Sequence, residues 1–281
     1  MTCFFRLPLT VAFLAAVCSF STFCEGASIL LVTQDATRDA DLIAHLESLG
    51  HAVTTGSFSE LDTTPADIAT LNTADLVVVT RNTNSGDYAS NAEEVAAWDS
   101  LTSPLVLGNG YISRNTRWSW VDTGNIQENY GLDISAPVGT TATHPFLAGA
   151  LPNEDFLTDP GASPAISGLM KYRPSSSTDI PDGGGVMGDG DTIAVRNNAS
   201  VPNVYIASWN ASEMTGSGNV LGGDRVFYAL PEDFSNFQPA GITIFDNIVN
   251  STLGIPEPSS LAILSIVGLA GAVAFRSRLG S

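Results

Sequence analysis

Cysteine is scarce in this 281-residue chain and is confined to one end of it. The three cysteines are Cys3, Cys18 and Cys24, and no thiol occurs from Glu25 onward. This absence excludes a disulfide, a cysteine metal site and a cysteine nucleophile from the main body of the chain.

Basic side chains are also few. Eleven Lys and Arg residues stand against 29 Asp and Glu residues, which gives a formal net charge of −18, and Lys171 is the single lysine. An acidic surface of this kind repels the phosphates of nucleic acids, so we expect no nucleic-acid partner. Hydrophobic residues make up 44% of the chain, which is enough to bury a core.

Histidine occurs three times, as His45, His51 and His144, and this scattered spacing does not form a zinc motif. We expect His45 to be solvated on the polar side of a helix and His51 to be structural. His144 is the best candidate for a catalytic histidine. The alternative is that it shapes a turn, because Pro145 restricts its backbone to an extended conformation.

The first 27 residues predict a signal peptide. Arg6 supplies a positive start, residues 7–20 form an apolar stretch, and cleavage is expected near Gly26 or Ala27. An uncleaved membrane anchor is the alternative. The predicted body of the protein then runs from 28 to 254.

The last 27 residues, 255–281, combine three features in a fixed order. Pro256, Glu257 and Pro258 come first, an uncharged run at 259–275 follows, and basic residues close the segment. The run has 17 residues, the lower limit for a helix that crosses a bilayer. Two arginines after the run would stay on the cytoplasmic side and leave the body outside; they are Arg276 and Arg278.

This order of motif, apolar helix and arginines resembles the PEP-CTERM sorting signal of Gram-negative bacteria. The resemblance implies an exported protein that is first anchored by its C-terminal helix and then handled by signal peptidase and an exosortase. It implies a final location at the cell surface or in the extracellular matrix. Whether the tail is cut or stays as an anchor is left open.

The body alternates between buried-strand patterns and amphipathic helix patterns, which predicts an α/β fold with a doubly wound, mostly parallel, flavodoxin-like sheet. Continuous apolar runs predict the strands, and apolar residues at helical spacing predict the helices. The first half yields strands at 29–33, 52–55, 74–80 and 104–108, and helices at 39–49, 65–71 and 91–101. After a loop-rich insertion at about 114–193, further strands are expected at 203–208 and 225–230, and a helix at 239–253.

Four phrases in the body resemble the class I glutamine amidotransferase-like superfamily, in particular its trehalose-utilisation-type branch. They are ILLVTQ from Ile29, ADLVVVT from Ala74, THPFLAG from Thr143 and RVFYALPED from Arg225. The resemblance implies an amidotransferase-like α/β domain over most of the body. Its nucleophile would stand in a Gly-x-Cys-x-Gly turn after a strand, where backbone donors hold an oxyanion.

The corresponding phrase here is Gly108-Asn109-Gly110-Tyr111, in which Gly110 occupies the cysteine position. Because the body has no cysteine, cysteine-dependent amidotransfer is excluded. The same edge of the sheet remains a candidate ligand site, since doubly wound folds bind ligands where parallel strands end. An aromatic and arginine cluster there can stack on a sugar ring or hold a carboxylate; its residues are Asn109, Gly110, Tyr111, Arg114, Trp118 and Trp120.

Asp189 and Asp191 offer oxygen ligands for calcium, but the spacing of a calcium loop is absent and a solvated turn is the preferred interpretation. No cofactor is expected. The favoured hypothesis is a non-catalytic surface or matrix protein that binds a partner or an exopolysaccharide. The alternative is a carbohydrate-active hydrolase or isomerase that uses His144 with Asp87 or Asp233.

Overall fold

The computed structural model describes the body of the chain with gaps. The described residues are 26–122, 124, 126–127, 134–135, 144–149, 158–159, 166–167, 177–179, 187–196, 203–237 and 239–255. Residues 1–25 of the predicted signal peptide and the whole predicted membrane span lie outside these residues. Within the described part of the chain, no helix has the length and apolar character that crossing a membrane requires.

A mixed sheet of ten strands forms the centre of the fold, and five of its strands are parallel neighbours in the order β2-β1-β3-β4-β12. An antiparallel extension β11-β10-β6 follows β12. The parallel strands are β1 (Ser28–Val32), β2 (Ala52–Gly56), β3 (Leu76–Val79), β4 (Leu105–Leu107) and β12 (Arg225–Tyr228). The extension contains β11 (Asn203–Trp209), β10 (Asp191–Arg196) and β6 (Ile134–Ser135).

Short strands complete the sheet at its antiparallel side. β9 (Ser177–Asp179) pairs with β11, and β5 (Ile126–Gln127) pairs with β9. A separate hairpin joins β7 (Thr158–Asp159) to β8 (Ile166–Ser167). The described parts of the predicted insertion therefore supply strands to the edge of the sheet, and the predicted α/β class with a mostly parallel sheet is confirmed.

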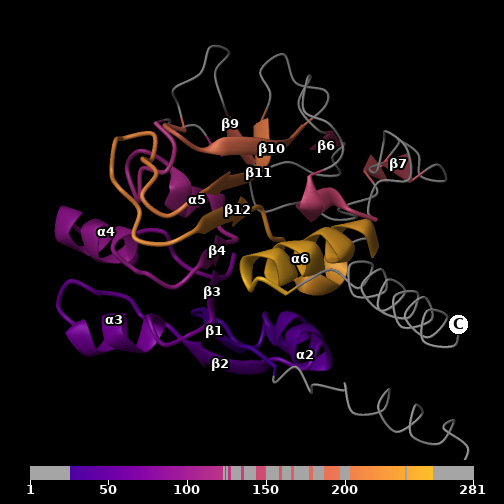
Figure 1. The fold of residues 1–281 in the computed structure, drawn as a ribbon, viewed down its shortest axis with the longest axis horizontal. Helices are drawn as coiled ribbons and strands as arrows, with labels where there is room; N and C mark the ends of the chain where they lie inside the picture. The colour runs from indigo at the N-terminus through magenta and orange to yellow at the C-terminus, as the bar shows by residue number, and fades with distance from the viewer. Residues whose placement is uncertain are drawn as a thin grey trace, which may run out of the picture.

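Helices cover both faces of the parallel part of the sheet. Figure 1 shows α2 and α6 on one side of the strands and α3 and α4 on the other. This coverage explains the continuous apolar runs, because β3, β4 and β12 are buried along their whole length. The helices are α2 (Ala40–Ser48), α3 (Pro65–Leu71), α4 (Ala92–Asp99), α5 (Gly110–Ser113) and α6 (Pro239–Thr252), with 3₁₀ turns η2 (Pro145–Leu147) and η3 (Phe234–Asn236).

The helix boundaries follow local chemistry. Pro65 occupies the first turn of α3, and the Asn91 side chain caps α4 by accepting a hydrogen bond from the Glu94 amide. Gly50 follows α2 with a φ of +93°, a conformation that glycine adopts without strain. Gly254 plays the same role after α6, with a φ of +65°.

The expectation that His45 is solvated is wrong. Its Nε2 lies 2.7 Å from Asp246 Oδ1, and its ring centroid lies 5.0 Å from that of Phe234. His45 therefore joins α2 to α6 and to the segment between β12 and α6. The periodicity of α2 identifies the residues on its polar face, but it does not show that α6 packs beside that face.

Four tryptophans and a tyrosine form one buried aromatic row. Ring centroids are 5.9 Å apart for Tyr88 and Trp98, 4.7 Å for Trp98 and Trp118, 5.6 Å for Trp118 and Trp120, and 5.4 Å for Trp120 and Trp209. These side chains come from segments before, within and after the predicted insertion. The row therefore packs the segment after α5 onto the sheet.

Arg225 is fully buried at the start of β12 and holds the C-terminal end of α4. Its Nη2 donates to Leu101 O at 2.6 Å and, at longer range, to the carbonyls of Trp98 and Asp99, while its Nη1 donates to Ser103 O. The last carbonyls of a helix have no partner within the helix. The guanidinium supplies these partners inside the core.

Asp99, the last residue of α4, is a buried carboxyl that accepts a hydrogen bond from Asn219 Nδ2 at 2.8 Å. Burial raises its pKa to about 6, although Asn219 and the charge of Arg225 oppose this shift. Asp99 therefore binds its proton more tightly in the folded chain than in the unfolded chain. Its contribution to stability is complete at acidic pH and is lost as the pH rises through about 6.

Replacing Arg225 tests the role of the buried guanidinium. The substitution Arg225→Met removes the donors from several buried carbonyls, and we expect the free energy of unfolding to fall by about 3 kcal/mol or more. Urea denaturation measures this change. Arg38→Met is the matched control, because its side chain is 60% exposed, and it should change stability by less than about 1 kcal/mol. Equal losses in the two variants would contradict the capping role.

The substitution Asp99→Asn should flatten the pH dependence of stability. The variant keeps an acceptor for Asn219 and cannot ionise. We compare the free energy of unfolding of the variant with that of the natural chain. The difference should be more favourable to the variant at about pH 7 than at about pH 4, by up to about 3 kcal/mol. Denaturant titrations at both pH values measure the difference. Asp122→Asn, at an exposed position, serves as the control. A pH-independent difference between Asp99→Asn and the natural chain would show that this account is wrong.

Candidate binding site at the carboxyl edge of the sheet

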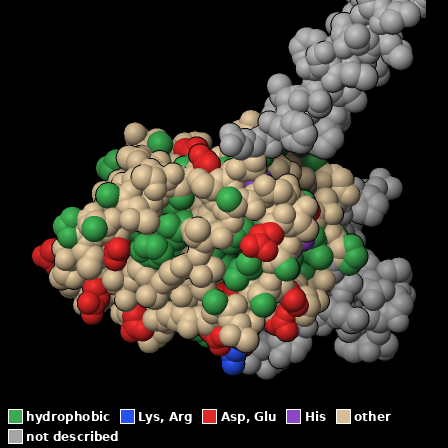
Figure 2. Space-filling view, turned by 90° about the horizontal axis from the view of Figure 1, so that it is seen from below, with side chains coloured by type: hydrophobic (Ala, Val, Ile, Leu, Met, Phe, Trp, Pro, Cys, Tyr) green, Lys and Arg blue, Asp and Glu red, His purple; other side chains and the backbone are tan. Residues whose placement is uncertain are grey.

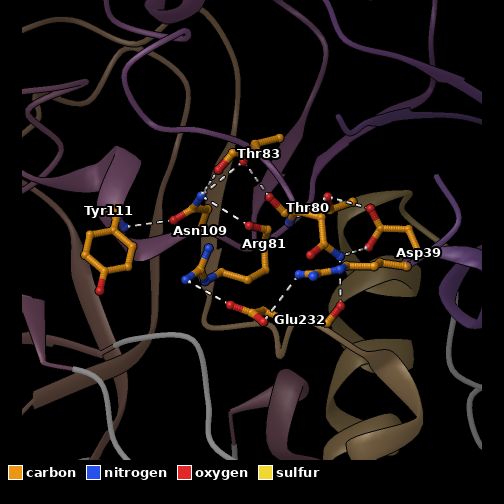
Figure 3. A network of polar contacts seen from close by, with 9 residues as sticks. Asp39, Thr80, Arg81, Thr83, Asn109, Tyr111 and Glu232 are labelled. Carbon is orange, nitrogen blue, oxygen red and sulfur yellow. Dashed lines mark hydrogen bonds and ion pairs between the residues drawn. The ribbon is translucent and has the colours of Figure 1, made fainter. Parts of the chain in front are cut away.

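Polar side chains gather where four parallel strands end. The loops after β1, β3, β4 and β12 meet at this carboxyl edge, and Figure 3 shows the side chains they contribute turned toward one another. The strand order reverses here, because β1 has β2 on one side and β3 on the other. Ligands in open α/β sheets bind at such a position.

Asp39 is the buried acidic end of this network. Its Oδ2 accepts from Thr80 Oγ1 and its Oδ1 accepts from Asn82 Nδ2, both at 2.8 Å. Burial raises the pKa of the Asp39 carboxyl, and its hydrogen bonds with Thr33, Asn82 and Thr80 oppose the shift. Asn82 Nδ2 also donates to Glu232 O at 2.8 Å. Asp39 thus joins the segment after β1 to the loop after β3, and Asn82 joins that loop to the loop after β12.

Asn109 is the buried centre of the network, with 1% of its surface exposed. Its Nδ2 donates to Thr83 O at 2.8 Å and to Thr83 Oγ1 at 3.1 Å. Its Oδ1 accepts from the Tyr111 amide at 3.0 Å and so caps the short helix α5. One side chain therefore joins the loop after β3 to the first turn after β4.

Tyr111 stands beside two arginines at the rim of the network. The guanidinium carbon of Arg81 lies 5.2 Å from the centre of the Tyr111 ring, and that of Arg114 lies 5.6 Å from it. These are cation–π distances. Arg81 also pairs with Glu232 at 3.4 Å, and Figure 3 shows its side chain between Asn109 and Glu232. Arg114 forms no ion pair with a carboxylate among the described residues.

The structure brings together four of the six residues predicted as ligand contacts. Asn109, Gly110, Tyr111 and Arg114 lie on the end of β4 and on α5, with Tyr111 and Arg114 partly exposed. Asn109 acts within the fold, because its polar atoms are taken up by Thr83 and Tyr111.

Trp118 and Trp120 are a correction to the sequence prediction. Each is 1% exposed and belongs to the buried aromatic row, so neither ring is available to stack on a ligand. The prediction assumed an extended segment with both rings on one outward face. Ser119 instead has a φ of +58°, which turns the chain between them.

The three residues of the enzyme hypothesis each have a structural partner. His144 Nδ1 accepts from the Phe146 amide at 3.2 Å and caps η2, while burial lowers its pKa. Asp87 accepts from Gln34 Nε2 at 2.8 Å, and Asp233 accepts from the Ser235 amide and hydroxyl. The hypothesis pairs His144 with a carboxylate, but no hydrogen bond joins the two among the described residues.

Asp189 and Asp191 do not form a metal centre with the residues that the structure describes, which contain no group of three potential ligands. Asp189 Oδ2 accepts from the Met214 amide at 2.9 Å, and Asp191 is exposed at the start of β10. Asp189 therefore stabilises a turn against the neighbouring loop.

The charged residues of the network were not among the predicted contacts; they include Asp39, Arg81 and Glu232. Each lies within a few residues of the end of a strand, and Arg81 belongs to a loop that was expected at this edge. Their position after apolar runs was the sequence signal that could have placed them at the carboxyl edge. Their mutual contacts depend on which strands are neighbours in the sheet, and this order follows only from the tertiary structure.

Comparison with known proteins gives no relative for this chain, since no protein-family model matches it and no curated protein matches it significantly.

The substitution Asn109→Ala tests the centre of the network. It removes the donor to Thr83 and the acceptor of the Tyr111 amide. We therefore expect a loss of about 2 to 4 kcal/mol in the free energy of unfolding. Asn84→Ala is the matched control, because Asn84 is exposed and its amide donates to Asp87 at 3.2 Å. Thermal unfolding of both variants measures the difference. A loss for Asn109→Ala no larger than that for the control would contradict the central role of this amide.

Proposed function

We propose that the chain is an exported, non-catalytic surface protein whose carboxyl edge binds an acidic carbohydrate. The contact that carries this proposal is that of Arg114 with the Tyr111 ring, 5.6 Å away. The tyrosine supplies a partly exposed aromatic face on which a sugar can stack. The arginine supplies donors for a carboxylate, such as that of a uronic acid.

The distribution of charge supports an anionic ligand at this edge. The structure describes the side chains of five arginines, and three of them belong to the carboxyl-edge loops: Arg38, Arg81 and Arg114. Arg38 and Arg81 both approach Glu232, at 3.6 and 3.4 Å, and Arg38 also pairs with Asp35 at 3.4 Å. Carboxylates therefore balance these two charges. On the face shown in Figure 2, by contrast, acidic groups are spread widely and basic groups are confined to one small area.

The first turn of α5 supports binding rather than amidotransfer. In the amidotransferase-like superfamily, the corresponding turn carries a thiol and free backbone donors for an oxyanion. Here Gly110 stands at the thiol position, and the Tyr111 amide already donates to Asn109 Oδ1. Both the nucleophile and one donor are therefore missing for that chemistry.

The fold itself supports the proposed likeness to flavodoxin-like and amidotransferase-like domains. Its parallel strands have the order β2-β1-β3-β4-β12, which corresponds to the order 2-1-3-4-5 of flavodoxin-like sheets. The likeness is one of architecture and supplies no activity.

Export and sorting are the second part of the proposal and rest on the sequence of the two ends. Residues 1–27 would be removed by signal peptidase. The motif Pro256-Glu257-Pro258, the membrane helix at 259–275 and the arginines Arg276 and Arg278 would present the protein to an exosortase. The body would then reach the cell surface or the extracellular matrix, where acidic exopolysaccharides are available ligands.

Binding of a uronic-acid oligosaccharide to the detergent-solubilised full chain tests the proposed ligand class. Arg114→Gln should weaken binding by at least about tenfold, because a hydrogen bond to a charged group contributes about 1.5 to 3 kcal/mol. Isothermal titration calorimetry measures the dissociation constant. Reduction of the carboxylates to alcohols in the ligand should have a similar effect.

Arg117→Gln is the matched control, since Arg117 is also partly buried and donates to the carbonyl of Thr116 rather than facing Tyr111. It should leave the affinity within about twofold of the natural chain. Undetectable binding of acidic oligosaccharides, or equal effects of the two substitutions, would rule out this ligand class at this site.

A further inference from the structure

The two boundaries of the folded body lie side by side. A hollow of about 660 Å³ is lined both by residues that open the body and by residues that close it, together with Asp75 and Pro104 from the starts of β3 and β4. Its lining consists of Gly26, Ala27, Ser28, Asp75, Pro104, Thr252, Leu253 and Ile255. The body therefore begins and ends at the amino edge of the parallel strands, opposite the carboxyl-edge site.

Hydrogen bonds fix both boundaries to this edge. Asp75 Oδ2 accepts from the Ser28 amide and from the Ser28 hydroxyl, each at 2.8 Å. At the other end, the Ile255 amide donates to Asn250 O at 2.8 Å, after Gly254 has ended α6. The chain is thus held by the fold as far as Ile255.

The sequence leaves a short connection between this fixed point and the predicted membrane span. Only Pro256, Glu257 and Pro258 separate Ile255 from the uncharged run that starts at Ser259. Three residues reach at most about 11 Å when fully extended. Two prolines further restrict the backbone of this connection. A folded body with so short a connection cannot rotate freely relative to the membrane.

The lining of this hollow carries little charge for a protein with a net charge of −18. Asp75 is the one charged residue in the lining of the hollow, and its carboxylate is already bonded to Ser28. The other lining residues are small, apolar or hydroxyl-bearing. Bringing this hollow close to a lipid surface therefore removes few charges from water.

From this arrangement we propose that the amino edge of the sheet is the face that the anchored protein turns toward the lipid bilayer. The carboxyl-edge site, with Tyr111 and Arg114, then points away from the membrane. The strands between the two edges hold this orientation because they are the rigid centre of the fold. This inference rests on the membrane tail of the proposed function and is independent of the ligand.

Cysteine labelling measures the orientation, because the body has no cysteine of its own. The full chain, with Cys3, Cys18 and Cys24 changed to serine, is reconstituted into phosphatidylcholine vesicles and treated with a bulky polyethylene-glycol maleimide. Thr73→Cys reports on the amino edge and Asn84→Cys on the carboxyl edge, and both positions are exposed. Detergent-solubilised samples give the unhindered labelling rate for each.

We expect Thr73→Cys to react several-fold more slowly in vesicles than in detergent, while Asn84→Cys reacts at a similar rate in both, once the fraction of inward-facing protein is subtracted. A flexible Gly-Ser spacer of about 12 residues between Ile255 and Pro256 should remove this protection, since it adds a mean reach of about 20 Å. Protection that the spacer removes would support the proposed orientation.

Two other outcomes overturn the inference and are distinguishable. If the chain floats with the vesicles but both cysteines react freely, or if protection survives the spacer, the tail is an anchor and the proposed orientation is wrong. If the chain does not float with the vesicles, the tail is not a membrane anchor. In that case this part of the proposed function is wrong, and the orientation is wrong with it.

Discussion

The side-chain amide of Asn109 joins two segments of the chain at the carboxyl edge. Its nitrogen donates to Thr83 on the loop after β3, and its oxygen accepts from the Tyr111 amide in the first turn of α5. The bond to Thr83 is buried and the bond from the Tyr111 amide is partly buried, so leaving either group unpaired would be costly. This side chain thereby helps to position Tyr111, whose ring lies beside Arg81 and Arg114.

If the proposed likeness to amidotransferases holds, the same hydrogen bond favours binding over amidotransfer. Asn109 already accepts from the Tyr111 amide, so this donor is not free for a reacting carbonyl. The aromatic and cationic groups remain at the rim, where they can meet a ligand. Arg225 acts in a comparable way deeper in the fold, since its guanidinium satisfies the last carbonyls of α4 inside the core. Buried polar groups thus fix the chain on both sides of β4, with Arg225 at the end of α4 and Asn109 at the start of α5.

Much of the fold could be predicted from the sequence, whereas only part of the site could. Continuous apolar runs identified β3 and β4, and Pro65 marked the start of α3, because these signals are local. The burial of Trp118 and Trp120 could not be predicted, since their partners Trp98 and Trp209 are distant in the sequence and the turn at Ser119 has no glycine to announce it. The pairing of Arg81 with Glu232 likewise depends on the order of strands in the sheet.

A crystal structure of the protein with an acidic disaccharide would test the central claim most directly. The account predicts a sugar ring against the face of Tyr111 and a carboxylate within hydrogen-bond distance of the Arg114 guanidinium, while Asn109 keeps its bonds to Thr83 and to the Tyr111 amide. A disaccharide bound elsewhere, or one that displaces the Asn109 side chain from the start of α5, would contradict it.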